Sequence, residues 1–103
     1  MTHTIRLRGF WDTSSDGTRT THSRNFGRPR TLNAGERVWL VCTSVPGPAE
    51  VSVNGRVVGA VIEAGPLAAD ITESLQQRNT ARFTLGSEGP LGEIALEIRG
   101  ATS

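Results

Sequence analysis

The sequence has few of the residues that build metal sites, disulfides or membrane spans. It contains one cysteine, two histidines, no tyrosine and no lysine. A lone Cys42 cannot form an intramolecular disulfide, and His3 and His22 have no further ligand at a metal-binding spacing. We find no signal-peptide pattern at the N-terminus and no apolar run of the length that crosses a membrane. A cytoplasmic location is therefore the default expectation.

The size of the chain excludes most large enzyme scaffolds. Its 103 residues (11.0 kDa) predict a single domain over 1–103, whereas a (β/α)₈ barrel needs about 250 residues. The formal net charge of +1 argues against a general nucleic-acid binder. The charge is uneven, because residues 1–40 contain seven arginines and three acids.

Apolar residues recur mainly with a period of two, which is typical of strands that cover a core with one face. The alternating segments are Ile5 to Leu7, Val51 to Val53, Ala81 to Leu85 and Ile94 to Ile98. Asn54-Gly55 predicts a tight hairpin, because both residues tolerate a positive φ. Residues 86–92 predict a longer loop, 18–26 a threonine-rich edge strand, and 67–77 one or two helical turns.

One strand is apolar on both faces. Residues 38–42 read VWLVC without interruption, which indicates that both faces are covered. A sandwich covers only one, so we expect Trp39 and Val41 to meet a loop, the N-terminal segment or another chain. The same pattern predicts that Cys42 is a buried small hydrophobic residue.

These elements predict an all-β protein: a two-sheet β-sandwich of about seven or eight strands with one short helical turn. A small closed barrel is the alternative.

Residues 36–99 resemble the jelly-roll, galactose-binding-like sugar-binding domain of glycoside hydrolase family two enzymes. The resemblance rests on V-S-V-N-G followed by V-G, on D-I-T with a following leucine, on an asparagine that opens an alternating strand, and on a glycine-rich approach to the last strand. The corresponding residues are Val51, Val53, Asn54, Gly55, Val58, Gly59, Asp70, Ile71, Thr72, Leu75, Asn79, Phe83 and Leu85. We expect Asp70 and Thr72 to cap the helical turn and Asn79 to adopt an unusual φ.

In that family the catalytic carboxylates lie on a separate barrel domain, so the resemblance implies a module that is not an enzyme. The residues agree with this interpretation, because no G-x-S-x-G sequence occurs and Glu88, Glu93 and Glu97 are most simply solubilising charges. No cofactor or metal is predicted. Asp12 and Asp16 before Gly17 could suggest calcium, but a polar turn explains the same residues.

Sugars present apolar C–H faces and a rim of hydroxyls, so an aromatic residue beside hydrogen-bonding side chains is the pattern to seek. The candidate ligand-binding residues are Trp11, Asp12, Arg24, Asn25, Phe26 and Arg28. Two hypotheses follow: a binding module for a carbohydrate or protein partner, and a structural or oligomerising domain that uses the face of Trp39 and Val41. The arginines at 19, 24, 28 and 30 could instead bind phosphate or an acidic partner.

Overall fold

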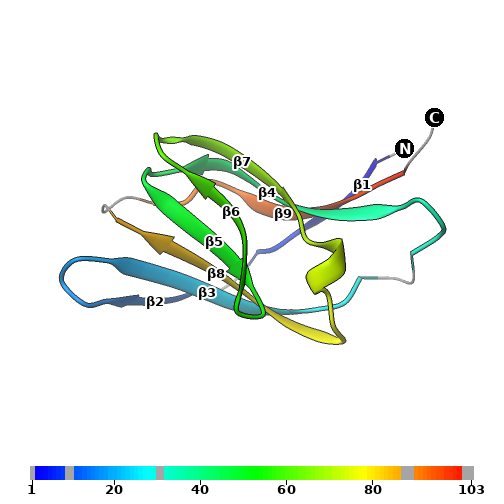
Figure 1. The fold of residues 1–103 in the computed structure, drawn as a ribbon, viewed down its shortest axis with the longest axis horizontal. Coiled ribbons are helices and arrows are strands. Elements are labelled where there is room, and N and C mark those ends of the chain that lie inside the picture. The colour runs from blue at the N-terminus through cyan, green and yellow to red at the C-terminus, as the bar shows by residue number, and fades with distance from the viewer. Residues whose placement is uncertain (1, 9–10, 30–31, 87–89, 101–103) are drawn as a thin grey trace.

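Nine β-strands and one turn of 3-10 helix form in the part of the chain that the computed structural model describes, residues 2–8, 11–29, 32–86 and 90–100. They are β1 (Thr2–Arg6), β2 (Asp12–Ser15), β3 (Thr20–Gly27), β4 (Arg37–Val45), β5 (Ala49–Val53), β6 (Arg56–Val61), β7 (Gly65–Asp70), η1 (Thr72–Ser74), β8 (Arg78–Leu85) and β9 (Ile94–Arg99). A four-stranded sheet in the order β1-β9-β4-β7 faces a five-stranded sheet in the order β2-β3-β8-β5-β6 (Figure 1). The predicted all-β sandwich is confirmed.

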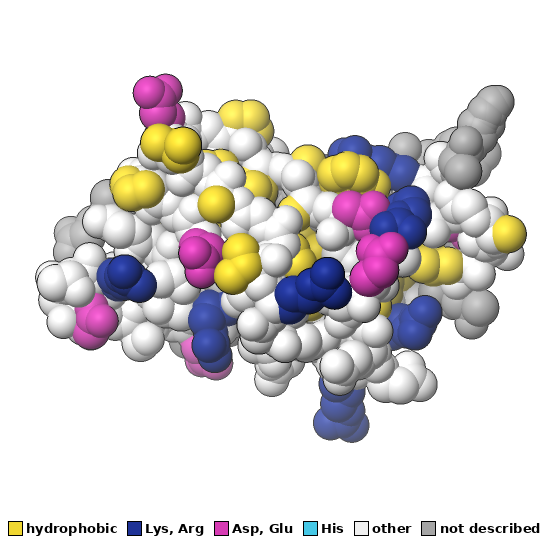
Figure 2. Space-filling view, in the orientation of Figure 1, with side chains coloured by type: hydrophobic (Ala, Val, Ile, Leu, Met, Phe, Trp, Pro, Cys, Tyr) yellow, Lys and Arg dark blue, Asp and Glu magenta, His cyan; other side chains and the backbone are white. Residues whose placement is uncertain are grey.

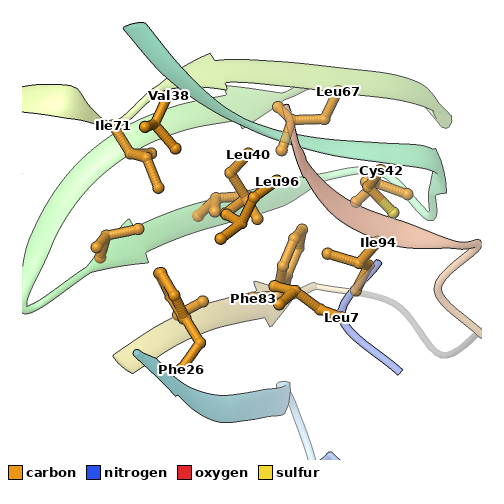
Figure 3. Packing of buried hydrophobic residues seen from close by; sticks show 14 of the residues in the cluster. Leu7, Phe26, Val38, Leu40, Cys42, Leu67, Ile71, Phe83, Ile94 and Leu96 are labelled. Atoms are coloured by element: carbon orange, nitrogen blue, oxygen red, sulfur yellow. The ribbon is translucent and has the colours of Figure 1, made fainter. Parts of the chain in front are cut away.

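Alternation along the strands separates the core from the surface. Outward-facing positions are largely polar, and charged side chains of both signs are scattered over the face shown in Figure 2. Inward-facing positions supply the core, where Phe83, Leu40 and Ile71 are fully buried (Figure 3). Cys42 is 2% exposed and packs in this core, as its apolar neighbours predict.

The hairpin between β5 and β6 has the predicted turn. Asn54 and Gly55 have φ angles of 54° and 83°, the left-handed values that a type I′ turn requires at both central positions. The side chain of Asn54 also receives a hydrogen bond from the Thr80 backbone N–H at 2.9 Å and donates one to the Ser74 carbonyl at 2.8 Å. The turn is thereby attached to the start of β8 and to η1.

Four local expectations need correction. Residues 67–70 belong to β7 and not to a helix, because Leu67 and Ala69 are buried while Ala68 between them is exposed; the helical turn is confined to Thr72–Ser74. The strand near 18–26 is β3, which lies inside its sheet, while β2 forms the edge.

Asn79 is the third correction, because its φ is not positive. It is 2% exposed within β8, and its side chain accepts the Gln76 backbone N–H at 2.7 Å and donates to the Gln76 carbonyl at 3.0 Å. Its place in the fold therefore depends on its amide group and not on its backbone freedom. The expected capping by Asp70 and Thr72 is not found, because the N-cap of η1 is Ile71 and no side chain caps it. Asp70 precedes that cap, and its Oδ1 accepts the Thr72 backbone N–H at 3.0 Å.

The two long edges of the sandwich differ. At one edge β6 packs against β7, where a Cβ on Gly59 would stand 3.3 Å from the Ala69 Cβ, so the absence of a side chain allows the close approach. At the other edge β1 lies opposite β3. The inner face of β3 carries three polar residues, Thr20, His22 and Arg24. Their partners in β8 are buried, namely Leu85, Phe83 and Ala81 in the same order. Polar side chains on an inner face mark the edge where the candidate site lies.

Trp39 and Val41 occupy the outer face of β4, as the unbroken apolar run predicts, and both are half-buried. The guanidinium carbon of Arg99, on the neighbouring strand β9, lies 4.6 Å from the centroid of the Trp39 ring. Arg99 thus covers one face of the Trp39 ring through a cation–π contact.

Candidate ligand-binding site

The largest hollow that we find beside the described residues is a groove of about 590 Å³, which we call the Trp11 groove. It begins between the sheets at Leu7, Trp11 and His22 and continues over the outer face of the four-stranded sheet. There it is lined by Thr4, Arg6, Val41, Thr43, Ala95 and Glu97, with Leu91, Gly92 and Glu93 at its end. Its volume lies within the range of small-molecule sites, and its lining combines apolar with hydrogen-bonding groups.

Trp11 both closes the core and lines the groove. Its ring meets that of Phe83 edge to face, with centroids 5.8 Å apart and planes at 73°, and it packs against the buried cluster while remaining partly exposed. An indole held in this way presents a fixed apolar surface to a ligand.

His22 was missed as a binding residue by the sequence reasoning, which considered it only as a metal ligand or catalytic group. It lies on the inner face of β3, with Nδ1 2.9 Å from the Thr13 hydroxyl oxygen, while Nε2 is buried and has no hydrogen-bond partner. The available signal was positional, because His22 has the same parity in β3 as the core residue Phe26.

The segment that ends the groove is tightly held against β4. The Gly92 backbone N–H donates to the Ser44 carbonyl at 2.8 Å, and the Glu93 N–H donates to the Thr43 hydroxyl oxygen at 2.9 Å. A Cβ on Gly92 would stand 2.2 Å from that hydroxyl oxygen, so only glycine allows this approach. The wall of the groove is therefore fixed by main-chain contacts.

A second hollow of about 470 Å³, which we call the arginine groove, separates β1 from β3. It contains four of the six predicted ligand-binding residues, and it meets the Trp11 groove at Arg6 and Leu7. The complete lining is Ile5, Arg6, Leu7, Arg24, Asn25, Phe26, Gly27, Arg28, Pro29 and Leu96. The structure thus places Trp11 in one groove and Arg24, Asn25, Phe26 and Arg28 in the adjoining one.

The predicted residues differ in what they can offer a ligand. Phe26 is 8% exposed and belongs to the core, so its ring is a floor and not an exposed plate. The Asn25 side-chain oxygen accepts a hydrogen bond from the Thr80 hydroxyl at 2.8 Å. Asp12 is exposed on the edge strand β2 and lines neither groove.

The turn after β2 uses its acidic residue internally. Asp16 Oδ1 accepts hydrogen bonds from the Arg19 N–H at 2.8 Å and from the Thr18 N–H and hydroxyl, each at 3.0 Å. These donors, the Arg19 N–H first, lower the pKa of Asp16. The predicted polar turn is present. No group of three potential metal ligands occurs within the ranges that the structure describes, and no helix there is long and apolar enough to cross a membrane.

Solved structures with the same arrangement of sheets include parts of glycoside hydrolases. A β-glucuronidase from Bifidobacterium dentium, in complex with coumarin-3-O-glucuronide, matches with a TM-score of 0.83 at 13% identity, over 97% of this chain and 30% of that one. The β-D-glucuronidase of Dictyoglomus thermophilum matches with a TM-score of 0.81 at 12% identity, over 97% and 28%. A glycosyl hydrolase family 2 member from Bacteroides cellulosilyticus gives 0.64 at 15% identity, over 81% and 12%.

No protein-family model and no curated protein matches the sequence. At these identities the likeness shows the fold, and at that level the expected resemblance to a β-sandwich part of glycoside hydrolase family two enzymes is confirmed. The chain spans less than a third of the length of these enzymes. The structural likeness covers 97% of the chain in the two glucuronidases, beyond the segment 36–99 that carries the sequence motifs, because β1 to β3 complete both sheets.

Proposed function

We propose that this chain is a non-catalytic carbohydrate-binding module whose ligand lies in the Trp11 groove. The observation that carries the proposal is the partly exposed Trp11 ring, fixed against Phe83 in the wall of a groove that is otherwise lined by polar and aliphatic residues. An indole face suits the C–H surface of a sugar ring, and the surrounding hydroxyl, guanidinium and carboxylate groups suit its hydroxyls. The fold shared with parts of β-glucuronidases supports the choice of a sugar as ligand.

The acidic residues of the groove favour binding over hydrolysis. Glu97 accepts two hydrogen bonds from the Arg99 guanidinium, at 3.0 and 2.7 Å, and this pair covers the outer face of β9 beside Trp39. Glycoside hydrolysis requires two carboxyl groups that flank the bond to be cut, whereas Glu97 is engaged in a surface pair with Arg99. We therefore assign Glu97 to the support of the surface and not to chemistry.

The test uses the two tryptophans as matched probes. In Trp39→Phe the remaining indole is that of Trp11, and in Trp11→Phe it is that of Trp39. After a glycan array identifies a binding sugar, titration should change the fluorescence of Trp39→Phe and leave that of Trp11→Phe unchanged. Trp11→Ala should weaken binding about tenfold, the equivalent of about 1.4 kcal/mol for a lost aromatic contact.

The control is Trp39→Ala, which removes an indole of the same size from outside the groove and should keep the affinity. Trp11→Ala will also lower the melting temperature because of its contact with Phe83, so affinities are compared below the unfolding transition. Silence across the array, or equal affinity of the two alanine variants, would contradict the proposal.

A second candidate function is a structural domain that associates through the outer face of the four-stranded sheet. The observation that favours it is the half-buried pair Trp39 and Val41, which lies beside Ala95 of β9 and Ala68 of β7. On this hypothesis light scattering detects a dimer, and Val41→Arg converts it to a monomer because a charge would be placed in the interface. A monomer at all concentrations would remove this candidate.

A further inference from the structure

The arginine groove has an unusual charge distribution for its position. Arg6, Arg24 and Arg28 are among the residues that line it, and no aspartate or glutamate is. Because Arg6 alternates with the inward-facing Ile5, its side chain belongs to the outer face of β1, and Arg24 and Arg28 are the cations of this groove. None of the three makes an ion pair with any residue in the described ranges. Two other arginines are paired: Arg37 binds Asp70 and Glu73, and Arg99 binds Glu97.

Arg24 makes this cluster more than a solvated patch. It stands opposite Ala81, a fully buried residue, in the β3–β8 ladder, so its side chain leaves the inner face of the sheet. Arg24 is only partly exposed, although a solvated arginine would gain more water contact on the outer face. An unpaired cation on an inner face is costly unless an anion approaches it.

The floor beneath the arginines is apolar. Ile5, Leu7, Phe26 and Leu96 form it, and Phe26 and Leu96 belong to the buried cluster. A small inorganic anion would use only the guanidinium groups, whereas an acidic sugar would use both features: its carboxylate or sulfate would bind arginine and its C–H face would lie on the floor. Because the groove meets the Trp11 groove at Arg6 and Leu7, one chain of sugar units could occupy both.

We propose that the ligand of this module is an anionic oligosaccharide, whose acidic groups bind Arg24 and Arg28 while a neighbouring sugar unit lies against Trp11. This inference rests on the proposed carbohydrate-binding function and adds the charge of the ligand and a second subsite to it. Arginine is suited to the role because its planar fork binds a carboxylate through two hydrogen bonds.

The experiment compares two probes of equal length, tetragalacturonic acid and its fully methyl-esterified form, by isothermal titration calorimetry on the full chain. The acid should bind at least about tenfold more tightly than the ester, because hydrogen bonds between charged groups are worth more than those of neutral ones. Raising the salt from about 0.02 to about 0.3 M should weaken binding of the acid and leave that of the ester nearly constant.

The variants are Arg24→Gln and Arg28→Gln, with Arg82→Gln as the control. Arg82 is exposed on β8 and pairs with Ser23 and Ser52, away from both grooves. Each groove variant should lose roughly three- to tenfold in affinity for the acid and keep its affinity for the ester. Arg82→Gln should bind both probes like the parent chain. Thermal unfolding of the variants checks that each remains folded.

The outcomes separate this inference from the function on which it rests. Equal binding of acid and ester, with loss in Trp11→Ala, would overturn the anionic ligand and leave the sugar-binding module intact. If Arg82→Gln weakens binding of the acid as much as Arg24→Gln does, the attraction is a diffuse effect of charge. That result would also overturn the anionic ligand. No binding of either probe would overturn the anionic ligand, whereas the sugar-binding module itself is overturned by silence across the glycan array.

Discussion

Asn54 shows how much of this fold depends on one side chain. Its backbone supplies the left-handed φ of 54° in the β5–β6 turn, and its amide group joins that turn to Thr80 of β8 and to Ser74 of η1. A third hydrogen bond, from Asn54 Nδ2 to Asn79 Oδ1 at 3.0 Å, continues the network to a side chain that is 2% exposed. The residue therefore acts on local geometry and on tertiary packing at once.

Two substitutions separate these contributions. Asn54→Gly keeps the positive φ and removes the amide hydrogen bonds, and we expect a loss of about 1–3 kcal/mol because buried partners are left unsatisfied. Asn54→Ala should cost about 1 kcal/mol more, because alanine resists the left-handed region. Urea unfolding measures both values. A glycine variant as stable as the parent chain would show that the network contributes nothing.

The sequence predicted the turn at Asn54 but not the network. The Asn-Gly pair is a local signal, read from two adjacent residues. The partners Ser74 and Thr80 lie 20 and 26 residues further along the chain, so only the folded topology brings them to the amide. Asn79 has the parity of the core residues Ala81 and Phe83, so its inward position could be predicted. Its hydrogen bond to Asn54, 25 residues away in the sequence, could not.

At the scale of elements, a charged cluster joins β4, β7 and η1. The Arg37 guanidinium donates to Asp70 at 2.9 Å and to both oxygens of Glu73 at 2.7 Å. The Thr72 hydroxyl oxygen accepts the Val38 backbone N–H at 2.8 Å, and it lies 2.7 Å from Asp70 Oδ1. Side chains of η1 thus close one end of the four-stranded sheet, at the start of β4.

The cluster predicts how stability depends on pH. Burial alone would raise the pKa of Asp70, but hydrogen bonds from Arg37 and then from Thr72 outweigh it and hold that pKa below its ordinary value. A carboxyl group with a lowered pKa in the folded state stabilises the fold above its unfolded pKa, and this contribution is lost as the pH falls through its folded pKa. Stability should therefore decrease below about pH 4.

Asp70→Asn tests this assignment. The variant should be less stable than the parent chain near pH 7, because Arg37 loses an ionised partner. The difference in stability between the two chains should become smaller in acid, where the Asp70 carboxylate of the parent chain becomes protonated. Thermal unfolding at several pH values between about 2 and 7 measures the difference. A difference in stability between variant and parent chain that stays constant over this pH range would contradict the role given to the Asp70 charge.

The element that the sequence misassigned lies in this same region. Residues 67–77 contain apolar residues four apart, Ile71 and Leu75, which is a helical spacing, yet Leu67 and Ala69 alternate into the core with the spacing of a strand. The pairing of β7 with β4 decides between the two patterns. Periodicity alone could not, because that pairing joins segments about 30 residues apart.

At the scale of the whole molecule, the grooves arise from the unequal number of strands in the two layers. The five-stranded sheet ends in β3 and β2 near the place where the four-stranded sheet ends in β1, so part of an inner face remains uncovered. Alternation predicted the strands and the core, but it could not predict where one layer stops short of the other. For that reason the sequence identified Arg24 and Trp11 as candidates and missed His22 and the outer wall of the Trp11 groove.

The most direct test of this account maps binding on the whole chain at once. In ¹H–¹⁵N correlation spectra with added tetragalacturonic acid, we predict shifts of the Trp11 indole N–H and of the backbone amides of His22 and Arg24, while the Trp39 indole N–H stays in place. Shifts confined to the Trp39 indole N–H, or the absence of any shift, would contradict the claim that the open edge between the two sheets is the ligand site.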